Sequence, residues 1–403
     1  GSDTLGSKST AMGHEALVAQ NFTTATDSHN VAVGYQAGHD ISTGIRNVLL
    51  GSTAGDALTD ADYNVAVGMG ALTRDLNGSR TTALGYSTLY NQNFTTATDS
   101  FNTAVGFQTG YNVTTGIKNT LVGADVGDAI TTGDFITAMG YNALGAETAG
   151  TRAVAIGASA LAAQNVGGGT TTYNTAVGHI AGFAMTSGIY NTLIGGAAGD
   201  ALTDADFNTA VGVFALTSDT MGSRSTAVGY NSLGTQNNTT ATNAYNVAMG
   251  YDAGGDITTG IQNTLMGSLA ANNLTDADFN VAIGVSALAS DHNGNRSVAV
   301  GYHALNAQNF TTSTNSNNTA VGYNAGKDVT TGTANVCLGA NAGDEMTTGS
   351  DNTIIGVAAC GTGIVTGDNN TIMGRNAAVS LTSGANNLLL GHDAGRTDSP
   401  SGN

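Results

Sequence analysis

The sequence predicts an all-β fold, a parallel β-roll or β-solenoid of about 22 turns, and three observations support it. A short phrase close to Asn-Thr-Ala-Val-Gly occurs 22 times in the 403 residues. Its final glycine, the anchor glycine, usually recurs at a 17-residue spacing, which lengthens at every fourth step. The whole pattern therefore forms a 72-residue super-repeat, as Gly34, Gly106 and Gly178 illustrate. Fixed periods of this kind are typical of stacked repeats, in which each turn packs on its neighbours.

The repeat defines the expected domain organisation. One continuous solenoid is expected over residues 1–395, followed by a C-terminal linker or tail over residues 396–403. The expected super-repeats are residues 14–85, 86–157, 158–229, 230–301 and 302–373. At a rise of about 4.8 Å per turn, 22 turns make a rod on the order of 100 Å long. Because the first turn is in phase almost from Gly1, without a capping segment, we expect the rod to belong to a longer chain.

Composition and charge exclude several classes of partner. The net charge is −18, from 29 acidic and 11 basic residues, and nucleic acids or anionic membranes need clustered basic residues instead. The sequence contains no run of about 18 apolar residues, so no membrane insertion is expected in this segment. Hydrophobic residues make up 40% of the chain and keep a strict phase, which argues against disorder.

Each anchor glycine is expected to end a short strand. The preceding residue is always Val, Leu, Ile or Met, and the residue three before the glycine is usually Thr or Val. These two positions share one face of a strand, whereas the residue between them, usually Ala, points to the other face. A second, less regular strand is expected to complete the turn. Because only three or four side chains per turn can point inward, we expect identical chains to complete the core as an intertwined homotrimer, with a filament as the alternative.

Asparagine occupies the position four before the anchor glycine in 16 of the 22 turns. Stacked amides at one phase hydrogen-bond from strand to strand, as they do in cross-β stacks. A structural ladder is therefore predicted, with these members among others: Asn30, Asn47, Asn64, Asn102, Asn119 and Asn174.

Two segments carry a resemblance to a known family. Residues 318–326, Asn-Thr-Ala-Val-Gly-Tyr-Asn-Ala-Gly, and residues 280–288, Asn-Val-Ala-Ile-Gly-Val-Ser-Ala-Leu, resemble the head repeats of YadA-like trimeric autotransporter adhesins. Similar repeats occur in bacteriophage tail fibres. The resemblance implies a left-handed, trimeric β-roll that is extracellular, on a cell surface or a virion. This chain departs from the family in its 17-residue turn, and no membrane anchor or chaperone domain of the family is recognised in it.

The 72-residue super-repeat brings rare basic residues to one phase. We expect them to act as recurrent locks between subunits through ion pairs or hydrogen bonds, with a ligand-binding basic stripe as the alternative. The recurrent basic residues are Lys8, Arg80, Arg152, Arg224 and Arg296. Their expected acidic partners are Asp62, Asp134, Asp206 and Asp278.

Two further motifs recur. An Asp-x-Asp-x-Asn spacing is similar to the opening of a calcium loop, although ordinary turns use the same residues and the Gly and Glu of an EF-hand are missing. The calcium candidates are Asp60, Asp62, Asp204, Asp206, Asp276 and Asp278. The four-residue insertions of the longer turns are expected to protrude and to offer an exposed ring to sugars or proteins, or else to fold that ring back over a neighbouring turn. These rings are Phe22, Phe94 and Phe310.

These features favour a structural, adhesive extracellular fibre with multivalent attachment to a surface glycan or receptor. The alternatives are a self-assembling filament without receptor binding, a polysaccharide-degrading fibre and an ice-binding solenoid. We expect no enzyme activity, because the acids follow the repeat and no catalytic motif interrupts it. Threonines that drift in phase disfavour an ice-binding face, and no cofactor other than calcium is suggested.

Overall fold

A computed structural model describes residues 3–361 and 366–395, so the expected tail at 396–403 lies outside the described residues. The described part is all β, without a helix, and the predicted β-solenoid is confirmed. The chain divides into two compact units, Gly1–Ala205 and Asp206–Asn403. Each unit contains eleven three-residue strands, one in every turn and each ending just before an anchor glycine.

The three-residue strands of the first unit are β2 (Thr10–Met12), β4 (Val31–Val33), β5 (Val48–Leu50), β6 (Val65–Val67), β8 (Thr82–Leu84), β10 (Thr103–Val105), β11 (Thr120–Val122), β12 (Thr137–Met139), β13 (Val154–Ile156), β14 (Thr175–Val177) and β15 (Thr192–Ile194). Those of the second unit are β16 (Thr209–Val211), β18 (Thr226–Val228), β20 (Val247–Met249), β21 (Thr264–Met266), β22 (Val281–Ile283), β24 (Val298–Val300), β26 (Thr319–Val321), β27 (Val336–Leu338), β28 (Thr353–Ile355), β29 (Thr371–Met373) and β30 (Leu388–Leu390).

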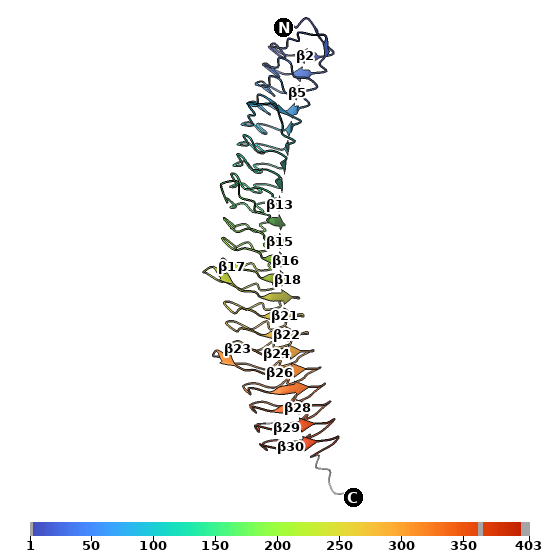
Figure 1. The fold of residues 1–403 in the computed structure, drawn as a ribbon, viewed down its shortest axis with the longest axis vertical. Helices are drawn as coiled ribbons and strands as arrows, with labels where there is room; N and C mark the ends of the chain where they lie inside the picture. The colour runs from blue at the N-terminus through green and yellow to red at the C-terminus, as the bar shows by residue number, and fades with distance from the viewer. Residues whose placement is uncertain (1–2, 362–365, 396–403) are drawn as a thin grey trace. The chain divides into compact units, whose positions relative to one another are not determined.

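Within each unit the strands pair in parallel and in register, turn on turn. In the pair β10–β11, for example, Thr103 lies opposite Thr120 and Ala104 lies opposite Leu121. The strands of each unit appear as a ladder of parallel arrows in Figure 1. Equivalent positions of the repeat therefore form straight columns, and this is why a side chain at one phase meets its counterpart in the next turn.

The core lies on the small face of the strands. The central strand residue is buried in every turn from β4 to β29, as Ala32, Leu49 and Ala66 illustrate. The two residues beside it, which form the strongest apolar pattern in the sequence, are only half-buried or exposed. The predicted difference between the two faces is confirmed, and the single chain buries the alanine face.

Large and small residues complement one another in filling this core. A Cβ on Gly38 would lie 2.7 Å from Cδ1 of Leu49, and one on Gly55 would lie 2.8 Å from its Cδ2. The large side chain of Leu49 therefore fits because its own turn and the preceding turn both carry glycine four residues after the anchor glycine. In other turns the residue four after the anchor glycine is a buried leucine, such as Leu72. The central strand residue of that turn is then small, as Ala66 illustrates.

The expected second strand occurs in eight of the described turns, as a strand of only two residues, and in the others the chain returns through turns. Non-glycine residues take left-handed backbone conformations at recurrent positions, such as Gln36 at φ 55° and Arg46 at φ 58°. These conformations bend the chain too often for an extended strand. The anchor glycines are also required: Gly68 has φ 136°, and a Cβ on it would lie 2.2 Å from the carbonyl oxygen of Gly85.

Four of the longer turns contain an additional two-residue strand, which pairs in parallel with a two-residue strand of the preceding turn. The pairs are β1 (Gly6–Ser7) with β3 (Thr26–Asp27), β7 (Gly78–Ser79) with β9 (Thr98–Asp99), β17 (Gly222–Ser223) with β19 (Thr242–Asn243), and β23 (Gly294–Asn295) with β25 (Thr314–Asn315). In Figure 1, β17 and β23 lie on the side of the turn opposite the three-residue strands.

Candidate functional site

One surface position combines exposure, unusual side chains and a strained backbone. It is the residue five before each anchor glycine, and we call its 22 members the outer column. Every member is exposed and has a left-handed backbone, with φ between 48° and 63°. In the first unit the outer column consists of Lys8, His29, Arg46, Tyr63, Arg80, Phe101, Lys118, Phe135, Arg152, Tyr173 and Tyr190. In the second unit it consists of Phe207, Arg224, Tyr245, Gln262, Phe279, Arg296, Asn317, Ala334, Asp351, Asn369 and Asn386.

The predicted basic locks all belong to the outer column, but their side chains do not take the predicted partners. Lys8 Nζ lies 2.6 Å from a carboxylate oxygen of Asp27, in the next turn of the chain. Arg80 pairs in the same way with Asp99. The expected partner Asp62 meets Arg80 through the backbone instead, because the Arg80 N–H donates to the Asp62 carbonyl oxygen at 3.0 Å.

Two of the later locks, Arg152 and Arg224, contact neutral groups at the equivalent position of the next turn. Arg152 donates from Nη1 to Oγ1 of Thr171 at 3.0 Å, and Arg224 donates to Oδ1 of Asn243. These contacts link successive turns of one chain. A role between subunits stays a prediction.

Aromatic rings separate the cations of the outer column, a feature that the sequence analysis missed. The Arg46 guanidinium carbon lies 5.2 Å from the centroid of the Tyr63 ring, and that of Arg80 lies 5.3 Å from the same ring. Lys118 Nζ and the Arg152 guanidinium carbon lie 4.9 and 5.2 Å from the centroid of Phe135. Such cation–π contacts are stabilising by about 0.5–1 kcal/mol at exposed sites. An alignment of the turns on their anchor glycines places these rings in one column and could have revealed the alternation.

The predicted protruding rings are wrong as contact residues. Phe22, Phe94 and Phe310 have exposed fractions of only 5%, 6% and 7%. The Phe94 ring lies over Gly78, where an added Cβ would meet it at 2.8 Å. The alternative of a ring folded back over a neighbouring turn is therefore confirmed. Threonines at the same loops, such as Thr95, remain exposed.

A buried carboxylate explains why these rings fold inward. Oδ1 of Asp75 accepts the backbone N–H of Phe94 at 3.0 Å and that of Gly78 at 3.1 Å. Its Oδ2 accepts from Nε2 of Gln92 at 2.6 Å. Burial raises the pKa of the Asp75 carboxyl, while these hydrogen bonds act in the opposite direction. The acid–glutamine pair thus closes each long turn from inside, and sequence reasoning missed it.

The same pair recurs in every super-repeat and bridges the interruptions of the asparagine ladder. The glutamine side-chain oxygen accepts from the next ladder asparagine, as Asn102 Nδ2 donates to Gln92 Oε1 at 2.9 Å. The acids with their glutamines are Asp3 with Gln20, Asp75 with Gln92, Glu147 with Gln164, Asp219 with Gln236, and Asp291 with Gln308.

The ladder asparagines themselves are buried and join neighbouring turns. Oδ1 of Asn30 accepts the backbone N–H of Asn47 at 2.9 Å, and Nδ2 of Asn47 donates to the Ala61 carbonyl at 2.7 Å. The direct amide contact of this pair is longer, 3.3 Å between Asn47 Nδ2 and Asn30 Oδ1. These two amides therefore bond most closely to backbone groups. Asn64, Asn102, Asn119 and Asn174 have the same backbone contacts.

The calcium candidates are distributed over separate turn contacts. Asp60 Oδ1 accepts from Thr43 Oγ1 at 2.7 Å, whereas Asp62 Oδ1 accepts the Ile45 N–H at 2.8 Å. Asp204 accepts from Ser187, Asp276 from Thr259, and Asp278 from the Ile261 N–H. Within residues 3–361 and 366–395, no three His, Cys, Asp or Glu side chains gather as a metal site. Asp206 donates its N–H to Ser223 Oγ.

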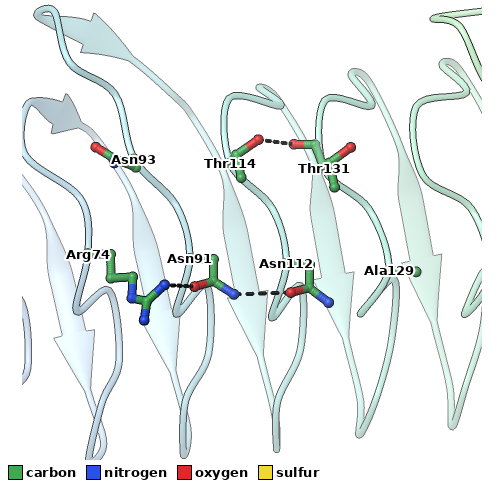
Figure 2. Close-up of a pocket in the computed structure, with 7 residues that line it drawn as sticks. All are labelled: Arg74, Asn91, Asn93, Asn112, Thr114, Ala129 and Thr131. Carbon is green, nitrogen blue, oxygen red and sulfur yellow. Dashed lines mark hydrogen bonds between the residues drawn. The ribbon is translucent and has the colours of Figure 1, made fainter.

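An open hollow beside Arg74 is lined by amide and hydroxyl side chains and by Ala129. Its volume is about 580 Å³, and Figure 2 shows its lining residues. Arg74 donates to Asn91 at 2.9 Å and Asn91 donates to Asn112 at 3.0 Å, so one row of the lining is satisfied internally. A smaller hollow of about 360 Å³ lies on the outer column beside Tyr63 and Arg80.

A comparison with protein-family models found no match to the chain, and a comparison with curated proteins found none either. No helix that could span a membrane occurs in the part of the chain that the structure describes. Function is therefore inferred from the geometry of the turns and from the resemblance described above.

Proposed function

We propose that the chain is a segment of an extracellular fibre, of the kind found in surface adhesins and phage tail fibres, and that it assembles with copies of itself. Its role is structural and adhesive: it supplies length and repeats one set of surface groups for multivalent attachment to a cell surface or glycan. The observation that carries this proposal is the apolar outward face of the strands.

This face consists of the strand residues on either side of the buried central one. Met139, Ile194 and Leu338 have exposed fractions of 44%, 40% and 45% in the single chain. Exposed apolar patches of more than a few hundred Å² are rare on monomeric proteins and mark interaction surfaces. Other large apolar side chains exposed immediately before an anchor glycine are Met12, Met249, Met266, Ile283, Met373 and Leu390.

A second row of exposed rings follows the anchor glycines. Tyr86 stacks on Phe107 with ring centroids 5.3 Å apart, and Tyr302 stacks on Tyr323 at 5.4 Å. Stacking covers the ring faces but leaves part of each ring exposed. Such rings are frequent in protein interfaces, where they contribute large apolar area.

A copy of this chain is the partner that best fits such a periodic face. Its own strands repeat with the same spacing, so that contacts made in one turn recur in the next. Three copies around an axis are favoured by the resemblance to YadA-like head repeats, and a closed arrangement covers the apolar face of each copy. Repetition along the chain then gives many equivalent outer contacts, which raise avidity when a ligand is repeated too.

The proposal is tested by charging the face. We expect the double variant Met249→Lys, Met266→Lys, which alters neighbouring strands β20 and β21, to lower the native particle mass relative to the unaltered chain. The control Thr239→Lys, Thr240→Lys places the same two charges on an exposed loop and should leave the mass unchanged. An unchanged mass for the double variant would contradict self-association through this face.

A further inference from the structure

We propose that the outer column binds a linear, sparsely charged polyanion, namely an acidic polysaccharide with one carboxylate on every second sugar. The inference rests on the proposed function, because an extracellular fibre encounters such glycans. It identifies where on the fibre the glycan attaches. The outer column concentrates positive charge on a chain of net charge −18. Seven of the eleven basic residues belong to it: Lys8, Arg46, Arg80, Lys118, Arg152, Arg224 and Arg296.

The fold does not require these side chains. The last five turns carry small or polar residues in the outer column, namely Asn317, Ala334, Asp351, Asn369 and Asn386. All five retain the left-handed backbone, with φ from 50° to 63°. Asparagine accepts this conformation readily, whereas a large side chain there costs on the order of 1 kcal/mol. Rings and cations at strained, exposed positions that asparagine could occupy therefore indicate a role beyond folding.

Part of the charge is left without an acidic partner. Lys8 and Arg80 pair with aspartates, but among the described residues no carboxylate lies within 4.0 Å of the cationic nitrogens of Lys118 or Arg152. The nearby Asp134 is directed elsewhere, since its Oδ1 accepts the Ile117 N–H at 2.7 Å. The segment from Lys118 to Arg152 is thus the part of the column best suited to an anion.

Spacing and ring geometry determine the class of polyanion. Cations occupy alternate turns of this segment, about 10 Å apart at a rise of about 4.8 Å per turn. An extended polysaccharide with an acid on every second sugar carries charges at a comparable interval. A nucleic acid strand carries one charge about every 3.4 Å, and so dense a polyanion is repelled more strongly by the net charge of this chain. Bases would also need free ring faces, but Lys118 and Arg152 lie against the two sides of the Phe135 ring.

The test uses the full chain with a hyaluronate oligosaccharide as the probe, by calorimetry at about 50 mM salt, where charge contacts are strong. We expect binding that weakens steeply with salt. The variant Lys118→Asn, Arg152→Asn introduces residues that other turns already carry at this phase. It should lower affinity at least tenfold and reduce the slope of log K against log salt by about one to two. The control Arg74→Asn, Lys327→Asn removes two cations outside the column and should bind as the unaltered chain does.

The proposal would be overturned by no binding of hyaluronate by the unaltered chain, by equal loss in both double variants, or by tighter binding of an oligothymidylate than of hyaluronate. Neutral dextran should not bind, and dextran binding equal to that of hyaluronate would also refute a charge-based site. Native mass, measured on the same samples, separates this proposal from self-association. If the particle is a single chain and still binds hyaluronate through Lys118 and Arg152, the binding site is supported and the proposed self-association is contradicted.

Discussion

Replacing one ladder asparagine should destabilise its turn far more than its size suggests. In Asn47→Ala, the Asn64 N–H loses the Oδ1 that accepts it at 2.9 Å, and the Ala61 carbonyl loses the Nδ2 that donates at 2.7 Å. Each buried backbone group left without a partner costs about 1–3 kcal/mol. The expected loss is therefore about 2–6 kcal/mol, equivalent to roughly a 30-fold to 10⁴-fold rise in the local opening constant.

Hydrogen exchange measures this effect directly at the amide of Asn64. The control Asn91→Ala removes a half-buried asparagine whose Nδ2 donates to Asn112 Oδ1 at 3.0 Å, and it should change the free energy of unfolding by less than about 0.5 kcal/mol. A rise of less than about threefold in exchange at Asn64 would refute the reasoning, because the two lost hydrogen bonds would then contribute nearly nothing.

The glycines and the buried acids give three further predictions. Gly212→Ala should destabilise the second unit by at least about 3 kcal/mol in thermal unfolding, because its Cβ would lie 2.3 Å from the Gly229 carbonyl oxygen. Gly196→Ala is the control, and it should be tolerated because open space surrounds Gly196. Asp219→Ala should lower the free energy of unfolding by about 2–5 kcal/mol and speed hydrogen exchange at the Asn238 N–H, which donates to Asp219 Oδ1 at 2.9 Å. Asp219→Asn keeps an acceptor and should lower the free energy of unfolding by less. Burial raises the pKa of Asp56 from 3.8 to about 6, so the folded state binds more protons than the unfolded state in this window and the free energy of unfolding falls as pH rises through it. Asp56→Asn should therefore flatten the pH dependence of the free energy of unfolding between about pH 4 and 7, by up to about 1 kcal/mol for a half-exposed group, and an unchanged pH profile would contradict this.

The repeat period alone was sufficient to predict the β-solenoid, since parallel strands in register are the direct consequence of a fixed spacing between anchor glycines. The ladder was predictable too, because a buried amide at one phase has few other ways to satisfy its hydrogen bonds. Neither inference depends on any single turn, and local irregularities such as Ile136 in the place of a ladder asparagine do not disturb them.

Features that depend on side-chain direction were not predictable. The acidic partner of Arg80 was expected at Asp62, but a left-handed backbone turns the Arg80 side chain toward Asp99. The Phe94 ring was expected either to be exposed or to fold back over a neighbouring turn, and the hydrogen bond of its N–H to the buried Asp75 fixes the inward conformation. Neither outcome could be read from the sequence, because sequence periodicity gives the phase of a residue and not the direction of its side chain.

The buried acids illustrate a third limit. Asp75 and Gln92 belong to successive turns and look like ordinary polar surface residues in a chain rich in Asp and Asn. Only the stacking of turns brings them within 2.6 Å and removes both from water. Their recurrence in every super-repeat was a usable signal, as was the alternation of rings and cations in the outer column.

The absolute mass of the native particle, measured by light scattering over a range of concentrations, tests most directly the claim that copies of this chain cover the apolar strand face. A chain of 40.0 kDa should give a particle of three chains, about 120 kDa. A mass of a single chain at every concentration would contradict the account, because the exposed Met139, Ile194 and Leu338 would then remain in water on a stable monomer.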